Sequence, residues 1–221
     1  MTQENVKTLF ESKFVKVFDL QYEEGKHYYD ATRRDKSNIV ALKSDEEFKK
    51  MLPDAVTCVV VIKQKDEEDK LLLSREYRYP AGRFLLSPPA GLIDASDFNP
   101  EDSEAVEKAI LHTASREIFE ETGISLKDTD KLELVNPLLF SSPGMTDESN
   151  AIALAVIELD DLEVLTQSGA EGTELFDGFK LVNKSEARDL ILSGRDEDGN
   201  FYSAYTWIAL SYFVALDIYN H

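Results

Sequence analysis

One stretch, R-E-I-F-E-E-T-G-I at residues 116–124, constrains the fold of this chain more than any other. Small or apolar residues lead into it at three- and four-residue spacing, as on a helix with one face packed inward: Val106, Ala109, Ile110, Ala114 and Ile118. Such a helix should end at Gly123, because glycine adopts the left-handed conformation of a helix terminus at low cost. The pattern predicts a helix whose last two turns carry Glu117, Glu120 and Glu121.

These three glutamates should share one small patch, since residues three and four apart are neighbours on a helix surface. A helix C-terminus carries partial negative charge, so acids there are unfavourable. Two carboxylates about 6 Å apart repel by roughly 3 kcal/mol at an effective dielectric near 20, against a typical domain stability of about 5–15 kcal/mol. A hard divalent cation such as Mg²⁺ would turn this repulsion into attraction. The acids alone leave open the alternative of a solvated face, screened by water and salt.

The stretch resembles the second half of the Nudix box, whose family pattern is G-x5-E-x7-R-E-U-x-E-E-x-G-U, with U a bulky apolar residue. Every fixed position of residues 116–124 matches, and P-P-A-G-L-I-D at residues 88–94 resembles the opening of the same box, with Gly91 as its first glycine. R-E-Y-R-Y-P-A-G-R-F-L-L at residues 75–86 and S-S-P-G-M-T-D-E at residues 141–148 resemble the ADP-ribose pyrophosphatase branch of that family. The resemblance covers roughly residues 37–217.

The chain departs from the family pattern before the helix. Gly91 and Arg116 are 25 positions apart, so about eleven residues are inserted, and we place the insertion within residues 95–104. Counted back from Arg116, the first glutamate of the box falls on Lys108, with Glu107 and Glu104 as nearby substitutes. The family's acidic residue before the proline-alanine-glycine turn is here Ser87.

The resemblance implies a set of site residues. Two or more Mg²⁺ or Mn²⁺ ions would be held by the Ala90 carbonyl and by Glu117, Glu120 and Glu121. Arg116 would orient an acid through a charge-assisted hydrogen bond, and Gly91 and Gly123 would be structural. Arg78 suits a phosphate and Tyr79 can stack on a base. Glu148, beside Asp147 on a Pro-Gly loop, would be the base that deprotonates the attacking water.

Composition narrows the possible partners. The 221 residues carry 24 Lys and Arg against 43 Asp and Glu, a net charge of −19, which argues against binding nucleic acid or an anionic membrane through a basic surface. Such a charge also repels an anionic nucleotide, so divalent metals would supply the local positive charge. The sequence shows neither a signal peptide nor an apolar run as long as a membrane span, and we expect a cytoplasmic protein. Cys58 lies in an apolar run and is expected to be a buried small hydrophobe.

Residues 1–50 read as an N-terminal strand module. Alternating residues flank an E-E-G-K turn and predict an antiparallel hairpin, with S-N-I-V-A-L at residues 37–42 as a third strand. In the resembled branch this sheet packs against a partner subunit, which implies a homodimer. The alternative is a sheet that covers its own domain. Residues 43–52 predict a short helix that joins this module to the main body.

Residues 51–221 are expected to form the Nudix domain itself. Strands are predicted at residues 56–63, 70–78, 131–140, 150–159 and 173–182, the first two as a hairpin, and helices at residues 184–192 and 204–219. The fold class is α/β (α+β): a Nudix fold with a mixed β-sheet sandwiched between α-helices and an N-terminal antiparallel module.

The expected activity is Mg²⁺-dependent hydrolysis of the diphosphate in a nucleoside diphosphate linked to another group. ADP-ribose is the favoured substrate, giving AMP and ribose 5-phosphate. Two alternatives stay open. Another nucleotide sugar or a dinucleoside polyphosphate would use the same metal chemistry, whereas a non-catalytic sensor of nucleotide sugars would need no intact metal acids.

Overall fold

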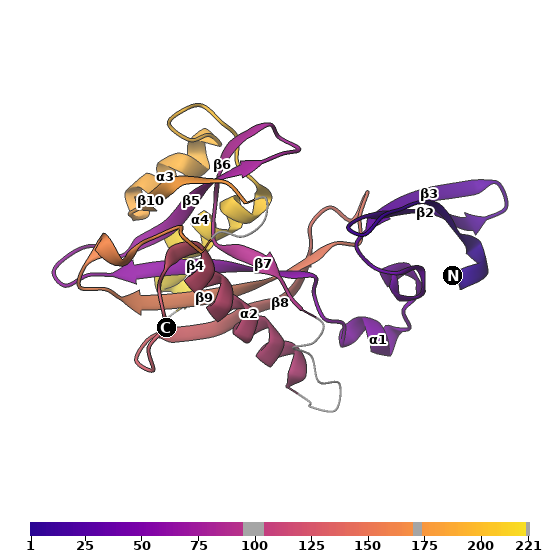
Figure 1. The fold of residues 1–221 in the computed structure, drawn as a ribbon, viewed down its shortest axis with the longest axis horizontal. Coiled ribbons are helices and arrows are strands. Elements are labelled where there is room, and N and C mark those ends of the chain that lie inside the picture. The colour runs from indigo at the N-terminus through magenta and orange to yellow at the C-terminus, as the bar shows by residue number, and fades with distance from the viewer. Residues whose placement is uncertain (95–103, 170–173, 220–221) are drawn as a thin grey trace. The chain divides into compact units, whose positions relative to one another are not determined.

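The computed structural model describes residues 1–94, 104–169 and 174–219, and these form two compact units (Figure 1). The first unit comprises Met1–Asp54 and Leu138–Asn150, and the second comprises Ala55–Pro137 and Ala151–His221. The first unit is therefore assembled from two segments that lie far apart in the sequence.

A three-stranded antiparallel sheet, β1-β2-β3, organises the first unit. The predicted hairpin is confirmed as β2 (Lys16–Glu23) and β3 (Lys26–Thr32). The third strand was expected at residues 37–42, and this expectation is wrong: β1 (Val6–Glu11) pairs with β2, and residues 37–42 form short 3-10 helices. These residues do not extend the sheet. Instead Ile39 is fully buried and packs against Val6, Phe18 and Leu20 in a small hydrophobic core.

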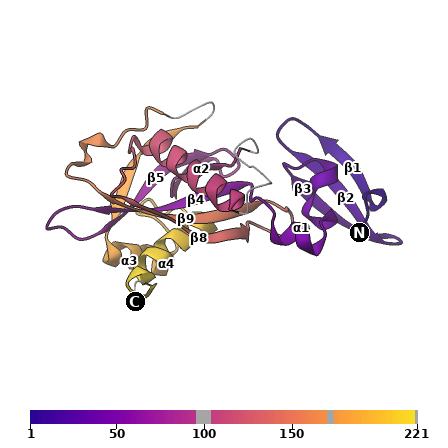
Figure 2. The same cartoon turned by 90° about the horizontal axis from the view of Figure 1, so that it is seen from below.

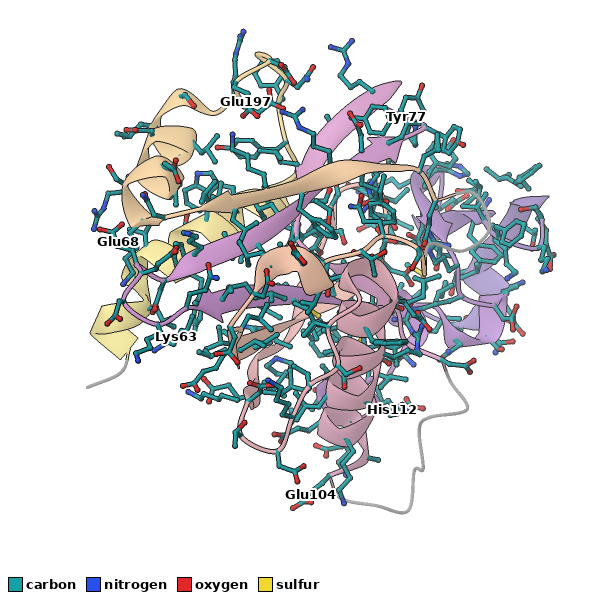
Figure 3. The ribbon with its side chains drawn as sticks, turned by 60° about the vertical axis from the view of Figure 1, so that its left-hand side comes forward. Lys63, Glu68, Tyr77, Glu104, His112 and Glu197 are labelled. Atoms are coloured by element: carbon teal, nitrogen blue, oxygen red, sulfur yellow. The ribbon has the colours of Figure 1, made fainter. Side chains whose placement is uncertain are left out.

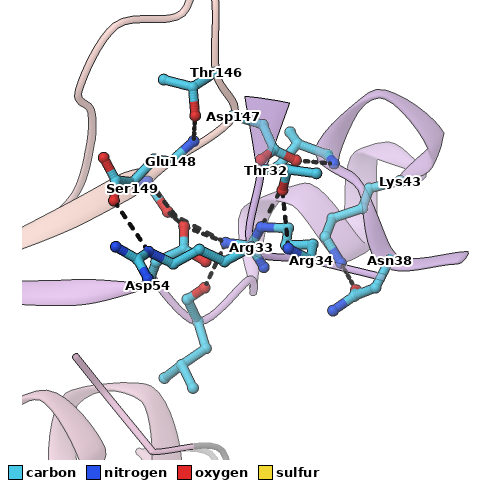
Figure 4. Close-up of polar contacts among 12 residues, drawn as sticks. Thr32, Arg33, Arg34, Asn38, Lys43, Asp54, Thr146, Asp147, Glu148 and Ser149 are labelled. Carbon is cyan, nitrogen blue, oxygen red and sulfur yellow. Dashed lines mark hydrogen bonds and ion pairs between the residues drawn. The ribbon is translucent and has the colours of Figure 1, made fainter. Parts of the chain in front are cut away.

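The segment at residues 138–150 completes the first unit through hydrogen bonds to β3. The Ala31 N–H donates to the Met145 carbonyl at 3.0 Å, and the Asp147 N–H donates to Asp30 Oδ1 at 3.0 Å. Arg34 follows β3, and its Nη2 lies 2.8 Å from Asp54 Oδ2, which also accepts from Ser149 (Figure 4). The predicted short helix is α1 (Asp45–Lys49), which begins at a capping box.

The second unit contains a mixed sheet in the order β10-β5-β4-β9-β8, with β6 paired to β5 and β7 paired to β4. The five predicted strands are confirmed within a few residues, and β6 and β7 are additional. Their bounds are β4 (Ala55–Lys63), β5 (Lys70–Arg78), β6 (Arg83–Ser87), β7 (Ala90–Leu92), β8 (Lys131–Phe140), β9 (Ser149–Glu158) and β10 (Phe176–Val182).

The sheet splits at Pro88 and Pro89. Before these residues β6 pairs with β5, and after them β7 pairs with β4. Proline has no N–H to donate to a strand ladder, so two successive prolines suit the point where the chain changes partner. The Pro89 carbonyl still accepts from the Cys58 N–H at 2.8 Å. This change of partner carries Ala90 and Gly91 from the β5 side of the sheet to the β4 side.

Helices cover both faces of this sheet (Figure 2). The predicted long helix is α2 (Ala105–Thr122), whose inner face packs Ile110, Ala114 and Ile118 against β4 and β9. β9 contributes Ala151, Ala153 and Ala155, and these small side chains leave room for the helix. The helices α3 (Lys184–Ser193) and α4 (Ala204–Tyr219) lie on the other face, as predicted. α2 is thereby held with its C-terminal end over the sheet near β7.

Cys58 is fully buried in β4, and its thiol donates to the Ala114 carbonyl at 3.8 Å. Burial raises the pKa of the Cys58 thiol well above its usual value, so the expected role as a small core residue fits its surroundings. Across residues 1–94, 104–169 and 174–219, none of the helices has both the length and the apolar character that a membrane crossing needs.

Candidate metal and active site

The C-terminal end of α2 has the geometry that the sequence predicts. Gly123 follows the helix with φ of 76°, and its N–H donates to the Phe119 carbonyl at 2.8 Å. A Cβ at Gly123 would meet Thr166 Cγ2 at 2.5 Å, so both conformation and space require glycine. This ending fixes the positions of the glutamates in the preceding two turns.

The three glutamates of α2 differ in burial. Glu117 and Glu121, one helical turn apart, are 7% and 5% exposed, and they face inward. Glu120 lies at the edge of the same patch, with 31% of its side chain exposed. A simple solvated acidic face would leave all three in water, so the buried positions of Glu117 and Glu121 are the informative ones.

Strand β7 passes directly against these acids. A Cβ built on Gly91 would lie 1.9 Å from the Glu117 carboxyl group, so Glu117 occupies the space that any other side chain at position 91 would need. The sequence suggested a tight turn at Gly91, whereas the structure shows a paired strand in which glycine permits close approach. Ala90 lies beside Glu121, to whose Oε1 its N–H donates at 3.4 Å.

Arg116 links the acids to one another and to β7. Its Nη2 lies 2.8 Å from Glu117 Oε1 and donates to the Leu92 carbonyl at 3.2 Å, while its Nη1 donates to Glu120 Oε2 at 2.7 Å. With these contacts Arg116 can orient the carboxylates of Glu117 and Glu120, which is the role that the resemblance implies for it.

Two further acids of the second unit act on this cluster, and sequence reasoning missed both. Glu76 lies on β5 with 12% of its side chain exposed, and Glu174 lies on the exposed segment just before β10. The charges of Glu76 and Glu174 both act on Glu121, and that of Glu174 also acts on Glu117. We call Glu76, Glu117, Glu120, Glu121 and Glu174 the acidic cluster.

Burial and mutual repulsion dominate the electrostatics of the acidic cluster. Burial raises the pKa of the Glu121 carboxyl well above its usual value, and the charges of Glu76, Glu117 and Glu174 add to this effect. Burial also raises the pKa of Glu117 and of Glu76, again with a contribution from Glu174. The fold therefore holds these groups where their ionised forms are unfavourable without positive charge nearby.

The acidic cluster fits a hard divalent cation. Arg116 pairs with Glu117 and Glu120, and Arg78 pairs with Glu76; carboxylate oxygens are the ligands that Mg²⁺ and Mn²⁺ prefer. No three Asp, Glu, His or Cys side chains of the described residues converge as ligands, and Glu76, Glu117 and Glu120 each pair with a guanidinium group. Glu117, Glu120 and Glu121 are the residues that would hold the metal, and Ala90, whose N–H donates to Glu121, lies beside them.

The expected substrate-binding residues lie at the end of β5. Arg78 Nη2 is 2.5 Å from Glu76 Oε2, so this arginine borders the acidic cluster. Tyr79 is 62% exposed, and its ring and that of Tyr77 are arranged edge to face with a centroid distance of 5.1 Å. Arg78 is thus placed to meet an anionic group at the cluster, and Tyr79 is an exposed aromatic residue of the kind that can stack on a base.

Glu148, the expected base, belongs to the first unit. Its carboxyl oxygen Oε1 accepts from Arg33 Nε at 3.4 Å, its N–H donates to Thr146 Oγ1, and 38% of its side chain is exposed (Figure 4). The adjacent Asp147 has a different setting, with its Oδ2 accepting from the Val40 N–H at 2.9 Å. Glu148 is the more accessible acid of the two.

Neither substitute for the missing first glutamate of the box joins the acidic cluster. Glu104 precedes α2 and pairs with Lys108, and Glu107 is exposed in the first turn. Figure 3 shows Glu104 at the start of the helix and His112 partway along it. At 1.5 Å per residue, Glu107 is about 15 Å along the helix axis from Glu117. The insertion predicted within residues 95–104 falls largely on residues 95–103, outside the described residues.

The NUDIX domain model matches residues 51–205, a span that contains the whole acidic cluster. The chain belongs to the Nudix family.

Individual relatives indicate a branch of this family. An ADP-ribose pyrophosphatase of Saccharomyces cerevisiae is 33% identical over 108 residues, 48% of this chain and 39% of the yeast protein. An ADP-ribose pyrophosphatase of Bacillus subtilis is 28% identical over 160 residues, 72% of this chain and 71% of that protein. This chain spans about two fifths of the length of the yeast relative.

The fold also resembles a solved structure. A crystal structure of an ADP compounds hydrolase superposes with a TM-score of 0.53 at 23% identity, covering 98% of this chain and 92% of that one. At this identity the likeness concerns the fold, including the N-terminal strand module with its antiparallel sheet.

Proposed function

We propose that this protein hydrolyses the diphosphate of a nucleoside diphosphate linked to another group, with ADP-ribose as the favoured substrate. The observation that carries this proposal is the acidic cluster, in which Glu117 and Glu121 are buried beside Gly91 at the end of α2. The printed names of the yeast and bacterial relatives support ADP-ribose as the first substrate to test. The expected products are AMP and ribose 5-phosphate.

The residues of the cluster have distinct tasks in this proposal. Glu117, Glu120 and Glu121 hold the divalent metal, and Arg116 keeps two of these carboxylates in place. Bound Mg²⁺ supplies Lewis-acid activation and offsets the charge of the diphosphate. Arg78, at the border of the cluster, orients a phosphate oxygen, and Tyr79 stacks on the base.

A carboxylate must also accept the proton of the attacking water, and two residues qualify. The sequence indicates Glu148, whereas the electrostatics of the second unit indicate Glu174, whose charge acts on Glu76, Glu117 and Glu121. A base must come within hydrogen-bond reach of the attacking water, close to the acids that would hold the metal. The influence of Glu174 on the metal-binding acids is therefore the observation in its favour.

The first experiment measures AMP release from ADP-ribose with Mg²⁺ by chromatography, beside a sample in chelator and the Glu121→Gln variant. Metal-dependent release that the substitution abolishes would establish the reaction and the cluster. If ADP-ribose stays intact, a panel of other ADP-containing diphosphates, including dinucleoside polyphosphates, separates a different hydrolase from a protein that only binds. Binding without turnover of any of them would favour the sensor.

We also propose that the protein is a homodimer. The strands of the first unit carry large apolar side chains that are about half exposed or more, which is unfavourable for a surface left in water: Leu9, Phe10, Tyr22, Tyr28 and Tyr29. Light scattering during size-exclusion chromatography should give about twice the 25.0 kDa mass of one chain. A mass of one chain at micromolar concentration would reject the dimer.

A further inference from the structure

A pocket of about 320 Å³ lies within the first unit, and its lining includes none of the residues assigned to hydrolysis. Its walls come from β3, α1 and the segment at residues 138–150, and its main lining side chains are Tyr28, Tyr29, Asp30, Phe48, Phe140 and Asp147. Ligand pockets in proteins begin at about this volume, so the space suits a small molecule or one end of a larger one. We call it the β3 pocket.

Two neighbouring carboxylates belong to the lining of the β3 pocket. The Asp147 N–H donates to Asp30 Oδ1 at 3.0 Å, which brings the two side chains together. Asp147 Oδ2 accepts from the Val40 N–H at 2.9 Å, whereas Asp147 Oδ1 is buried and has no hydrogen-bond partner among the described residues. A buried carboxylate oxygen without a donor is unfavourable unless a ligand supplies one.

Positive charge is scarce around these carboxylates. Arg34 Nε lies 3.8 Å from Asp147 Oδ2, but Arg34 Nη2 is already held by Asp54 at 2.8 Å (Figure 4). One guanidinium group thus pairs with two carboxylates, Asp54 and Asp147, and its charge also acts on Asp30. Burial and the charge of Asp147 raise the pKa of Asp30 to about 6, so Asp30 is mainly ionised at neutral pH. The pocket is therefore complementary to a cation.

The aromatic walls indicate which kind of cation would bind. Tyr28 and Tyr29 are half exposed on β3, and the rings of Phe48 and Phe140 stack with a centroid distance of 6.1 Å. Ring faces attract organic ammonium and guanidinium groups, whose methylene portions also bury against apolar walls. A metal ion such as Mg²⁺ would instead need several oxygen ligands and water. We propose that the β3 pocket binds a small organic cation with an ammonium or guanidinium head group.

The test uses butylammonium and butylguanidinium chloride as probes, with butanol as the neutral control. The chain contains three methionines, and Met145 lines the pocket. Carbon-13 labelling of the methionine methyl groups therefore gives one resonance at the pocket, with Met1 and Met51 as internal references. Met145→Leu assigns the resonance by removing it. The cations should move the Met145 signal to saturation at one site per chain, and butanol at the same concentration should not.

Variants tie this binding to the carboxylates. Asp147→Asn keeps an acceptor for the Val40 N–H but removes the charge, and it should weaken binding of butylammonium roughly tenfold or more. Asp160→Asn, an exposed acid in the second unit, makes the same change in net charge and should bind as the parent does. Thermal unfolding shows that each variant is folded.

Three results would overturn the proposal. These are a Met145 shift of equal size with butanol, cation binding that Asp147→Asn leaves unchanged, and stronger Asp147-dependent binding of adenine than of either cation. The last would make the pocket a site for neutral rings with N–H donors. Because none of these measurements depends on hydrolysis, they stand whether or not ADP-ribose is the substrate.

Discussion

At the scale of one residue, Glu121 illustrates how a side chain suited to metal binding can lower the stability of the fold that contains it. Its carboxyl is 5% exposed among the charges of Glu76, Glu117 and Glu174, which together with burial keep its pKa well above the usual value. A group with a raised folded-state pKa stabilises the fold only while it is protonated, and that contribution is lost as pH rises through the folded pKa. Above its raised pKa, where Glu121 is ionised, its buried charge therefore destabilises the metal-free protein.

Glu121→Gln should separate function from stability. We expect metal-dependent AMP release to fall by about 10²-fold or more, since an anionic metal ligand is lost. Thermal unfolding in chelator should show a variant at least as stable as the parent, because the neutral amide removes the buried charge. A variant that is inactive because it is unfolded would contradict this account.

The two candidate bases can be distinguished by paired substitutions. Loss of a general base typically costs about 10²- to 10⁴-fold in rate, so only one of Glu174→Gln and Glu148→Gln should show such a loss in kcat. The electrostatics of the acidic cluster lead us to expect it for Glu174. The affected variant should also lose the acidic limb of the pH-rate profile. A full loss in Glu148→Gln with Glu174→Gln active would assign the base to the first unit.

At the scale of elements, the site depends on how closely β7 and the segment before β10 approach α2. A Cβ at Gly91 would strike the Glu117 carboxyl group at 1.9 Å, at the far end of a flexible side chain. A Cβ at Gly169 would instead strike the Glu120 carbonyl oxygen at 2.3 Å, which belongs to the helix backbone. The first clash can be relieved by moving one side chain, and the second cannot.

Alanine substitutions at Gly91 and Gly169 should therefore differ in their effects: the first on activity and metal affinity, the second on stability. Gly91→Ala should cost little stability but reduce activity and metal affinity strongly, because Glu117 is displaced. Gly169→Ala should cost about 1–3 kcal/mol, as overpacking does. Gly144→Ala is the matched control, since its Cβ would meet only the Tyr28 hydroxyl at an ordinary 3.8 Å. Thermal unfolding and metal titration measure both effects, and a Gly91→Ala protein with normal metal affinity would refute the argument.

Periodic and motif-bearing elements could be predicted from sequence, and elements defined by tertiary packing could not. Helix α2 was predictable because Ile110, Ala114 and Ile118 repeat at helical spacing and Gly123 ends them. Residues 37–42 were predicted as a strand because their apolar run carries no sign that Ile39 would be buried beneath the sheet. Local sequence cannot distinguish these two outcomes.

The metal-binding acids were predictable for a similar reason, since three glutamates on one helix share a local pattern. Glu76 was not, because it joins the cluster only through the position of β5 beside β7 and α2. In S-R-E-Y-R a single acid on a strand resembles any surface residue. An odd feature was available, however: an acid on β5 only three residues beyond the fully buried run Leu71, Leu72 and Leu73.

At the scale of the whole molecule, the net charge of −19 makes metal binding a stability effect as well as a catalytic one. A ligand that binds only the folded state stabilises it by RT ln(1 + [L]/Kd), about 2.7 kcal/mol at a hundredfold excess over Kd. For a chain of this size Mg²⁺ should raise Tm by roughly 5–10 °C. NaCl at equal ionic strength controls for screening, and Glu121→Gln should lose most of the specific shift.

Asp30 gives the first unit a pH-dependent stability of its own. Burial and the charge of Asp147 raise its pKa to about 6 from 3.8, so the folded state binds a proton more tightly than the unfolded state. Stability from this group is therefore full below about pH 4 and is lost as pH rises toward 6. Asp30→Asn should remove this loss, making the variant relatively more stable at pH 7 by on the order of 1 kcal/mol, since partial solvation reduces the full value. Unfolding midpoints of both proteins between pH 4 and 7 provide the test, and parallel curves would contradict it.

Because the first unit is built from two segments of the chain, it can finish folding only late in synthesis. Strands β1 to β3 leave the ribosome before residues 138–150, yet Ala31 and Asp30 can make their hydrogen bonds to Met145 and Asp147 only when that later segment has emerged. The 83 intervening residues, 55–137, which hold most of the β4 to β8 region, must be made in the meantime. Until the loop that carries Glu148 has been synthesised, the N-terminal sheet therefore lacks part of its hydrogen bonding and leaves apolar side chains exposed. A nascent chain stalled before residue 138 would be the species most dependent on chaperones.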